Sequence, residues 1–196
     1  MMNYAAHELL ETSEALRTKK AEIEQHGAFI HQTRDQHLKS ILSKHQQQMI
    51  TAYQQGINLL QGKGAQIPNQ APHFQPHNAD VGLGAQATSS SAPMANTQTL
   101  SDQTMATLAL NAHKSGAMLG MLWAGECVDP QLRTFHVNGA VLCQEMAYEI
   151  WTWMNQNGYY QPPTFSTTQT HQMAGMFQPM NQTGMNQMNY NQNPMQ

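Results

Sequence analysis

The sequence has little charge, few cysteines and no long apolar run. Only 11% of its 196 residues are charged, the formal net charge is −3 and the mean hydropathy is −0.56. It has no basic stripe of the kind that binds nucleic acid. No run approaches the roughly 20 apolar residues that a membrane helix needs, and the start lacks the parts of a secretory signal. We therefore expect no nucleic-acid partner, no membrane insertion and no signal peptide.

Two cysteines, Cys127 and Cys143, are the only ones in the chain. Cys127 falls at a predicted turn and Cys143 lies within the last predicted helix. Helical geometry separates them by about 24 Å, whereas a disulfide needs Cα atoms within about 7 Å. We expect two buried thiols without an internal bridge, with an intermolecular bridge through Cys127 as the alternative.

The first 61 residues predict a helical hairpin. Apolar residues recur every seven positions in the first helix, at about 3–27. The second helix covers about 34–61, and we place the turn between them at 27–33, taking Gly27 as a C-cap. The predicted stripe of the first helix is Leu9, Leu16, Ile23 and Ile30. The predicted stripe of the second helix is Leu38, Leu42, His45, Met49, Tyr53, Ile57 and Leu60.

A second hairpin is predicted over 100–163. Ser101 is a good N-cap for its first helix, and Asp129 followed by Pro130 is a typical start for the next. Asn157-Gly158 ends the last helix. The predicted buried face of the third helix is Met105, Leu108, Ala109, Ala112, Leu119 and Trp123. That of the fourth is Leu132, Phe135, Gly139, Leu142, Met146, Ile150 and Trp153.

The two hairpins are joined by a Pro/Gly/Ser-rich linker at 62–99 and followed by a Gln/Asn/Met-rich tail at 164–196. Neither segment has an apolar period, so we expect both to be disordered. Hairpin, long crossover and hairpin is the connectivity of a ferritin-like four-helix bundle. The predicted fold class is therefore all-α, a ferritin-like four-helix bundle built from two hairpins.

Carboxylates with the spacing of a di-metal site are absent. Such a site needs a Glu-x-x-His pair on each of two helices. The residue three positions after Glu145 is Tyr148, and the second helix contains no glutamate. Glu149 is followed at that spacing by Thr152, and the third helix offers only Glu126, at its end. We expect no catalytic residue, no metal ligand and no cofactor.

Ten histidines are scattered along the chain without the spacing of a zinc cluster. His7 and Glu11 have the i,i+4 spacing of a surface metal clamp. We interpret the histidines as surface polar groups with at most weak metal affinity, except His45, which the stripe places in the core as a hydrogen-bonded histidine. The remaining histidines that we considered are His26, His31 and His37 near the first turn and His73 and His77 in the linker.

Other patterns have simpler explanations. Gly82 to Ala87 matches the letters of a dinucleotide fingerprint, but it lies in the linker rather than between a strand and a helix. The tail methionines are soft Cu(I) ligands, yet their irregular spacing favours an adhesive low-complexity tail. Trp151 and Trp153 cannot share one helix face, so we expect one of them to point away from the core.

Four motifs of the second hairpin resemble the coat F family of spore coat proteins. They are Leu100-Ser101-Asp102-Gln103, Ala112-His113-Lys114-Ser115-Gly116, Asp129-Pro130-Gln131-Leu132-Arg133 and Asn157-Gly158-Tyr159-Tyr160. The resemblance covers about 99–163 and is looser over 1–60. It implies a ferritin-like fold and a structural role in the bacterial endospore coat, and it supplies no catalytic residues.

The predicted function is therefore a non-enzymatic coat component that assembles with other spore coat proteins or with itself. The protein would be made in the mother-cell cytoplasm. Cross-links through Lys63 and glutamines, or through Tyr159, Tyr160 and Tyr190, are further hypotheses. The alternatives are a ferritin-like metal-binding or oxidative protein with altered ligands and a soluble cytoplasmic adaptor.

Overall fold

The computed structural model describes residues 4–63, 67–68, 81–84, 86 and 91–178, and the chain divides into two units, 1–161 and 162–196. The first unit consists of four long helices, and the described residues contain no strand. The helices are α1 (Ala6–Gln32), α2 (Gln36–Leu60), α3 (Asp102–Glu126) and α4 (Pro130–Gln156). The predicted all-α fold is confirmed.

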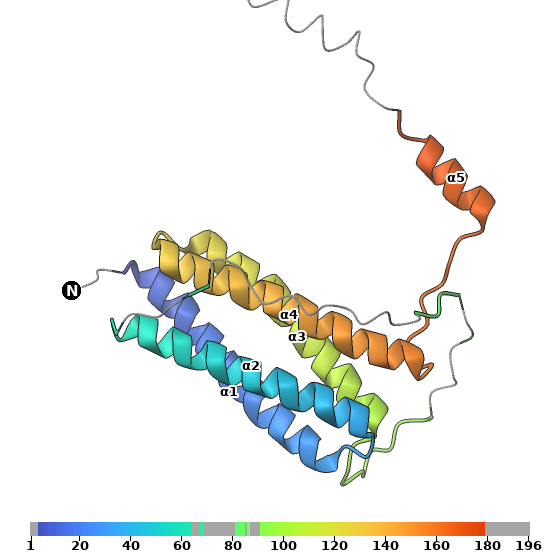
Figure 1. The fold of residues 1–196 in the computed structure, drawn as a ribbon, viewed down its shortest axis with the longest axis horizontal. Coiled ribbons are helices and arrows are strands. Elements are labelled where there is room, and N and C mark those ends of the chain that lie inside the picture. Colours follow the sequence, from blue (N-terminus) through green and yellow to red (C-terminus); the bar gives the residue numbers. More distant parts are fainter. Residues whose placement is uncertain (1–3, 64–66, 69–80, 85, 87–90, 179–196) are drawn as a thin grey trace, which may run out of the picture. The chain divides into compact units, whose positions relative to one another are not determined.

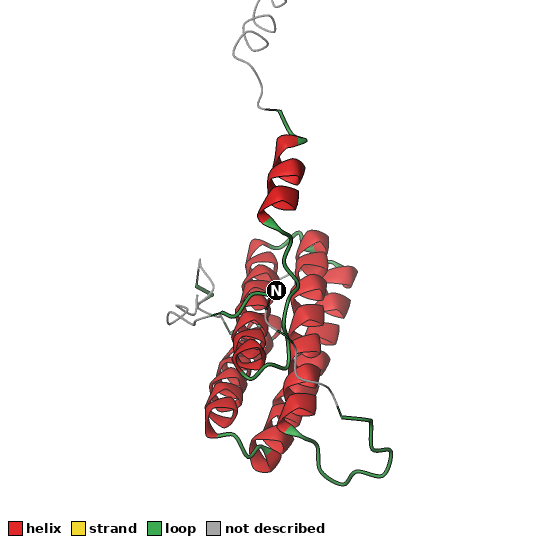
Figure 2. Cartoon of the chain, turned by 90° about the vertical axis from the view of Figure 1, so that its right-hand side faces the viewer, coloured by secondary structure: helices red, strands yellow, loops and turns green. Residues whose placement is uncertain are grey.

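The four helices lie side by side as two antiparallel hairpins (Figure 1). α1 packs on α2 and α3 packs on α4, while α1 also contacts α3 and α2 contacts α4. α1 and α4 therefore lie diagonally opposite, as do α2 and α3. Figure 2 shows the packed helices from a second direction. The connectivity is the predicted one, with the long segment between α2 and α3 joining the hairpins.

Side-chain caps fix where three helices begin. The Asp35 carboxylate accepts from the Leu38 amide at 2.7 Å, at the start of α2. The predicted cap Ser101 accepts from the Thr104 amide at 3.1 Å. Asp129 likewise caps α4, which has a proline at its first position. Each cap satisfies an amide that has no partner within its own helix.

The predicted first turn at 27–33 is wrong, because α1 continues through Gly27 and the turn falls after Gln32. Gly27 has a packing role instead. A Cβ atom there would lie 3.1 Å from the side-chain nitrogen of Gln46, which donates to the carbonyl of Ile23 at 2.9 Å. The glycine lets the two helices approach without terminating either.

Apolar clusters occupy both ends of the bundle. The larger lies near the α1–α2 turn and includes Phe29, Leu42, Met105, Ile150 and Trp153. The smaller one groups buried residues near the opposite end, namely Leu59, Cys127, Leu132 and Phe135. The predicted faces of α4 and of the first half of α2 agree closely with these clusters.

The predicted stripe of α1 is wrong. Leu9 is exposed, and Leu16, Ile23 and Ile30 are only half-buried. The helix instead buries a mostly polar face one position away: Glu8, Thr12, Ala15, Lys19, Glu22, His26 and Phe29. Two of these polar groups have partners on other elements, because Glu8 accepts from the Asp129 amide and the Thr12 hydroxyl lies 3.1 Å from His136 Nε2. The apolar period of the helix alone therefore could not identify the buried face.

The predicted face of α3 is wrong in part. Leu108 is exposed, and Leu119 and Trp123 are half-buried. The buried residues are Met105, Ala106, Ala109, Leu110, His113, Gly120 and Ala124. Small residues occupy this face because α3 approaches α4 closely.

Side-chain hydrogen bonds attach described residues of the segment between α2 and α3 to α4. The Asn155 side chain accepts from the Gly82 amide at 2.8 Å and donates to the Gly82 carbonyl at 2.9 Å. Asn138 donates to the Pro68 carbonyl at 2.6 Å. Most of the predicted disordered linker, including His73, His77 and part of the Gly82–Ala87 motif, lies outside the described residues.

The second unit contains α5 (Thr167–Gly175), which the sequence analysis did not predict. The Ser166 hydroxyl accepts from the Gln169 amide at 3.3 Å, and the Gln169 side-chain oxygen accepts from the Ser166 amide at 3.0 Å. Such a capping box starts a helix without any apolar period. All residues of α5 are exposed, and residues 179–196 of the predicted tail lie outside the described residues.

Gly120 and Gly125 give a matched test of how α3 packs on α4. A Cβ atom at Gly120 would lie 3.1 Å from the backbone nitrogen of Ala140, whereas one at Gly125 would meet nothing within 4 Å. We expect Gly120→Ala to lower the free energy of unfolding by about 1–3 kcal/mol, because backbone cannot yield. Gly125→Ala should raise it by up to about 1 kcal/mol through helix propensity. Urea titrations of both variants measure this, and equal effects would contradict the proposed close approach.

Candidate functional site

Three histidines meet in the centre of the bundle. His26 comes from α1, His45 from α2 and His113 from α3, and all three are fully buried, with 0% exposure. The His113 ring centroid lies 5.2 Å from that of His26 and 5.2 Å from that of His45. One potential ligand atom from each residue lies within 4.8 Å of the other two. We call these three residues the histidine triad.

Each triad residue lies on the buried face of its helix. His26 follows Glu22 by one turn, and His113 follows Ala109 by one turn. His45 lies where the sequence predicted it. The predicted surface position of His26 is wrong, and the sequence motifs gave His113 no role as a ligand. The sequence signal for the burial of His113 was its position four residues after Ala109, which was predicted to lie in the core.

Two of the three imidazoles are oriented by hydrogen bonds. His26 Nδ1 donates to the carbonyl of Glu22 at 2.9 Å, which leaves its Nε2 atom with a lone pair. His45 Nε2 lies 2.7 Å from a carboxylate oxygen of Glu149, on α4. Neither ring nitrogen of His113, nor Nε2 of His26, has a hydrogen-bond partner among the described residues. The triad thus contains buried acceptor groups that nothing in the described protein satisfies.

Glu149 connects the triad to the surface. Its other carboxylate oxygen accepts from the Lys44 ammonium group, and its side chain is 26% exposed. Burial tends to raise the pKa of Glu149, but the hydrogen bonds from His45 and Lys44 outweigh it and lower the pKa. The carboxylate is therefore charged at neutral pH and accepts a hydrogen bond from His45 Nε2. The spacing of Glu149 excluded it from a di-metal site and did not predict its contact with His45.

Burial keeps the triad neutral. Desolvation lowers the pKa of His26 to about 4 despite its bond to the Glu22 carbonyl. Desolvation also lowers the pKa of His113 well below its ordinary value, and the other two histidines add to the shift. A neutral imidazole carries a nitrogen lone pair, and it is the neutral form of histidine that ligates metals.

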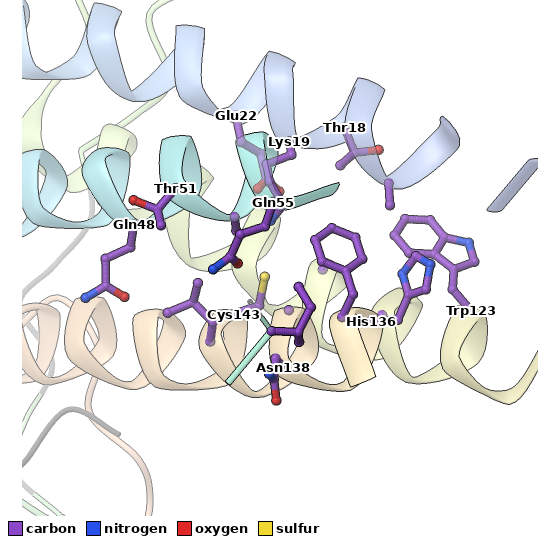
Figure 3. A pocket seen from close by; sticks show the side chains of 18 of the residues that line it. Thr18, Lys19, Glu22, Gln48, Thr51, Gln55, Trp123, His136, Asn138 and Cys143 are labelled. Carbon is purple, nitrogen blue, oxygen red and sulfur yellow. The ribbon is translucent and has the colours of Figure 1, made fainter. Parts of the chain in front are cut away.

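A cavity of about 360 Å³ lies between the helices, beside the histidine triad and on the side away from the α1–α2 turn. Figure 3 shows Lys19 and Glu22 from α1, Gln48 from α2 and Cys143 from α4 around it. Burial raises the pKa of Glu22, with Lys19 opposing, and it raises the pKa of the Cys143 thiol to about 11. The thiol is therefore protonated and a poor nucleophile at neutral pH.

His136 lies at one side of this cavity, where its Nε2 atom is 3.1 Å from the hydroxyl oxygen of Thr12. Burial lowers its pKa to about 4, and the Lys19 charge adds to the shift. His136 is not among the grouped ligand atoms of the triad and is hydrogen-bonded to Thr12, so it is a separate polar group of the core.

The other histidine and carboxylate candidates remain apart. His7, His31 and His37 are exposed and join no described cluster of ligands, and Glu126 is exposed at the end of α3. The expectation of no metal ligand and no catalytic residue stays a prediction.

The expectation for the cysteines is confirmed. Cys127 and Cys143 are both buried and free. Trp153 is buried and donates to Asp35 at 3.2 Å, and Trp151 is half-buried and also packs against the larger apolar cluster. The expectation that one of the two tryptophans points away from the core is therefore wrong in part. Among the described residues, no helix is long and apolar enough to span a membrane.

A family model matches part of the chain. Residues 101–163 match the model of the Coat F domain, in agreement with the resemblance noted in the sequence. This stretch, which holds the second hairpin, is therefore similar to a Coat F domain. No curated protein matches the chain.

Two solved structures share the fold. A candidate spore coat protein from Bacillus halodurans C-125 aligns with a TM-score of 0.63 and 16% identity, over 85% of this chain and 97% of the other. A conserved hypothetical protein from Mycobacterium tuberculosis aligns with a TM-score of 0.53 and 14% identity, over 76% of this chain and 97% of the other. At these identities the likeness supports the helical fold alone.

The buried His136 should make stability depend on pH. Its pKa is about 4 in the folded protein, below the ordinary 6.5. Between these values the unfolded chain binds a proton that the folded protein does not, so the free energy of unfolding falls as pH is lowered. We expect His136 to contribute a loss of about 3 kcal/mol across this window. His136→Gln should remove that part of the loss in urea titrations.

His37→Gln is the control for this experiment, because His37 lies in water at the surface of α2. The free energy of unfolding of the His37→Gln variant should depend on pH as that of the native protein does. Parallel profiles for the native protein and His136→Gln would show that the imidazole of His136 is not the titrating group.

Proposed function

We propose that the chain is a structural, non-enzymatic component of the bacterial endospore coat that acts through protein–protein assembly. The single observation that carries the proposal is the Coat F domain at residues 101–163. The domain supplies α3 and α4, which form the most closely packed helix pair of the bundle.

The surface of α3 supports an assembly role. Met118 is 70% exposed and Leu122, one turn later, is 61% exposed. Met121 is exposed between them, and Val128 is exposed just beyond the helix. Residues at i, i+3 and i+4 share one helix face. Contiguous exposed apolar side chains commonly mark protein-contact surfaces, so this α3 face suits contact with another coat protein.

The second unit offers further contacts of the same kind. Its described part carries exposed apolar side chains on and around α5, namely Phe165, Met173, Met176 and Phe177. Several weak contacts on one chain raise the overall strength of attachment without any single tight interface. The low charge of the chain limits repulsion between neighbouring copies.

Localisation and extraction test the proposal. A fluorescent fusion of the full chain should form a ring around the forespore during sporulation. The protein should then leave purified spores only in strong denaturant with reductant. Diffuse fluorescence and release on gentle cell breakage would reject the coat assignment and favour a soluble adaptor.

The α3 face can be tested separately. Met118→Gln combined with Leu122→Gln removes apolar contact area without disturbing the core, since both side chains are exposed. We expect this variant to fold with native stability but to leave spores at a lower denaturant concentration. Met94→Gln, at an exposed position outside the helices, is the control and should be retained normally. Equal retention of both variants would show that another surface anchors the protein.

A further inference from the structure

We propose that His26, His45 and His113 bind one divalent late first-row transition-metal ion of the Zn²⁺ type in the centre of the bundle. The site uses one residue from each of three helices, and a fourth helix supplies Glu149 as the orienting carboxylate. The inference goes beyond the proposed function and does not depend on it.

The distances suit a single ion. Three atoms that all lie within 4.8 Å of one another have a common point no more than about 2.8 Å from each of them. Zinc–nitrogen bonds are about 2.0–2.1 Å long. The three nitrogens therefore need to close by less than about 1 Å each, a movement that small rotations of the imidazole rings supply.

The hydrogen bonds already present select which nitrogens face the ion. Metal-bound histidines usually donate their other ring N–H to a backbone carbonyl or a carboxylate. His26 makes such a bond to the Glu22 carbonyl, and His45 makes one to Glu149. The ligand atoms are then Nε2 of His26 and Nδ1 of His45. These orienting bonds are present without any ion.

His113 supplies the independent observation that points to a ligand. Its side chain is 0% exposed, and neither of its ring nitrogens has a partner in the described structure. A buried polar group without a partner is destabilising, so cores rarely contain one. Here the unpartnered ring lies against the two other imidazoles, and one ion would satisfy lone pairs on all three residues.

The donor chemistry limits the class of ion. Neutral imidazole suits Zn²⁺, Cu²⁺, Ni²⁺ and Fe²⁺, whereas Mg²⁺ and Ca²⁺ require mainly oxygen ligands. The absence of a sulfur donor from the triad argues against a site selective for Cu(I). Three protein ligands leave at least one coordination position for water or another small ligand.

The test is equilibrium binding of Zn²⁺ to the full chain, first stripped with a chelator. A competing chelator during the titration suppresses weak binding by surface histidines such as His7 and His37. We expect one tight equivalent per chain. His113→Leu should weaken its affinity at least about 100-fold, since losses of 10–100-fold follow the removal of a mere outer-shell partner.

His136→Leu is the matched control, because it removes another buried histidine by the same substitution. It should retain the tight equivalent, as should Cys143→Ala in the neighbouring cavity. Absence of a tight equivalent in the native protein, or one that survives His113→Leu, would overturn the proposal. A tight equivalent lost in Cys143→Ala would place the ion in the cavity and also overturn it.

A measurement on the native chain keeps the test decisive if His113→Leu does not fold. X-ray absorption of the zinc-loaded protein should show imidazole scattering from three ligands and no sulfur. Glu149→Gln, which leaves all three imidazoles in place, should weaken binding about 10-fold. Sulfur scattering, or fewer than two imidazoles, would reject the triad as the site.

Discussion

The polar face that α1 turns into the bundle constrains the rest of the structure. A four-helix bundle usually buries leucine and isoleucine from every helix, yet α1 buries Glu8, Lys19 and His26. A buried polar group that has no hydrogen-bond partner lowers the free energy of unfolding by about 1–3 kcal/mol. Glu8 has such partners, whereas Nε2 of His26 has no hydrogen-bond partner among the described residues.

Glu8 illustrates how a buried charge is accommodated. Its carboxylate accepts from the backbone amides of Ala5 and Asp129, so it caps the start of α1 and holds the α3–α4 turn in place. Burial would raise the pKa of Glu8, but these backbone hydrogen bonds lower it. A single side chain thereby joins the two hairpins at one end. At the opposite end, Asp102 accepts from the backbone amides of Arg34 and Asp35 and joins them again.

Much of the fold could be predicted from the sequence, because the caps and helix breakers are local signals. Ser101, Asp129 and Asn157-Gly158 act through neighbouring backbone, and the ends of α3 and α4 follow from them. The path of α4 was also predictable, since its buried face is largely apolar. The end of α1 was not, because Gly27 serves a contact with Gln46 from another helix.

The histidine triad lay beyond the sequence analysis for a different reason. Apolar periodicity identifies a buried face only when that face is apolar, and the heptad from Leu9 to Ile30 outlines the flank of α1 instead. His26 and His113 are 87 positions apart, with their ring centroids 5.2 Å from each other. Their pairing depends on the crossover connection, which brings α3 against α1. Spacing rules for zinc sites cover ligands from one local segment and miss ligands drawn from three helices.

A metal ion at the triad and a structural role in a coat are physically compatible. The triad is fully buried, whereas the exposed apolar residues Met118 and Leu122 lie on the outer face of α3. Binding in the core and contact at the surface thus use different atoms. An ion that binds only the folded chain stabilises it in proportion to the logarithm of its concentration over its dissociation constant. Because the ligands come from both hairpins, such an ion would oppose their separation and stabilise the bundle as a unit. A bundle with an all-leucine core would lack that link, since apolar packing carries no requirement for three particular side chains to meet at one point.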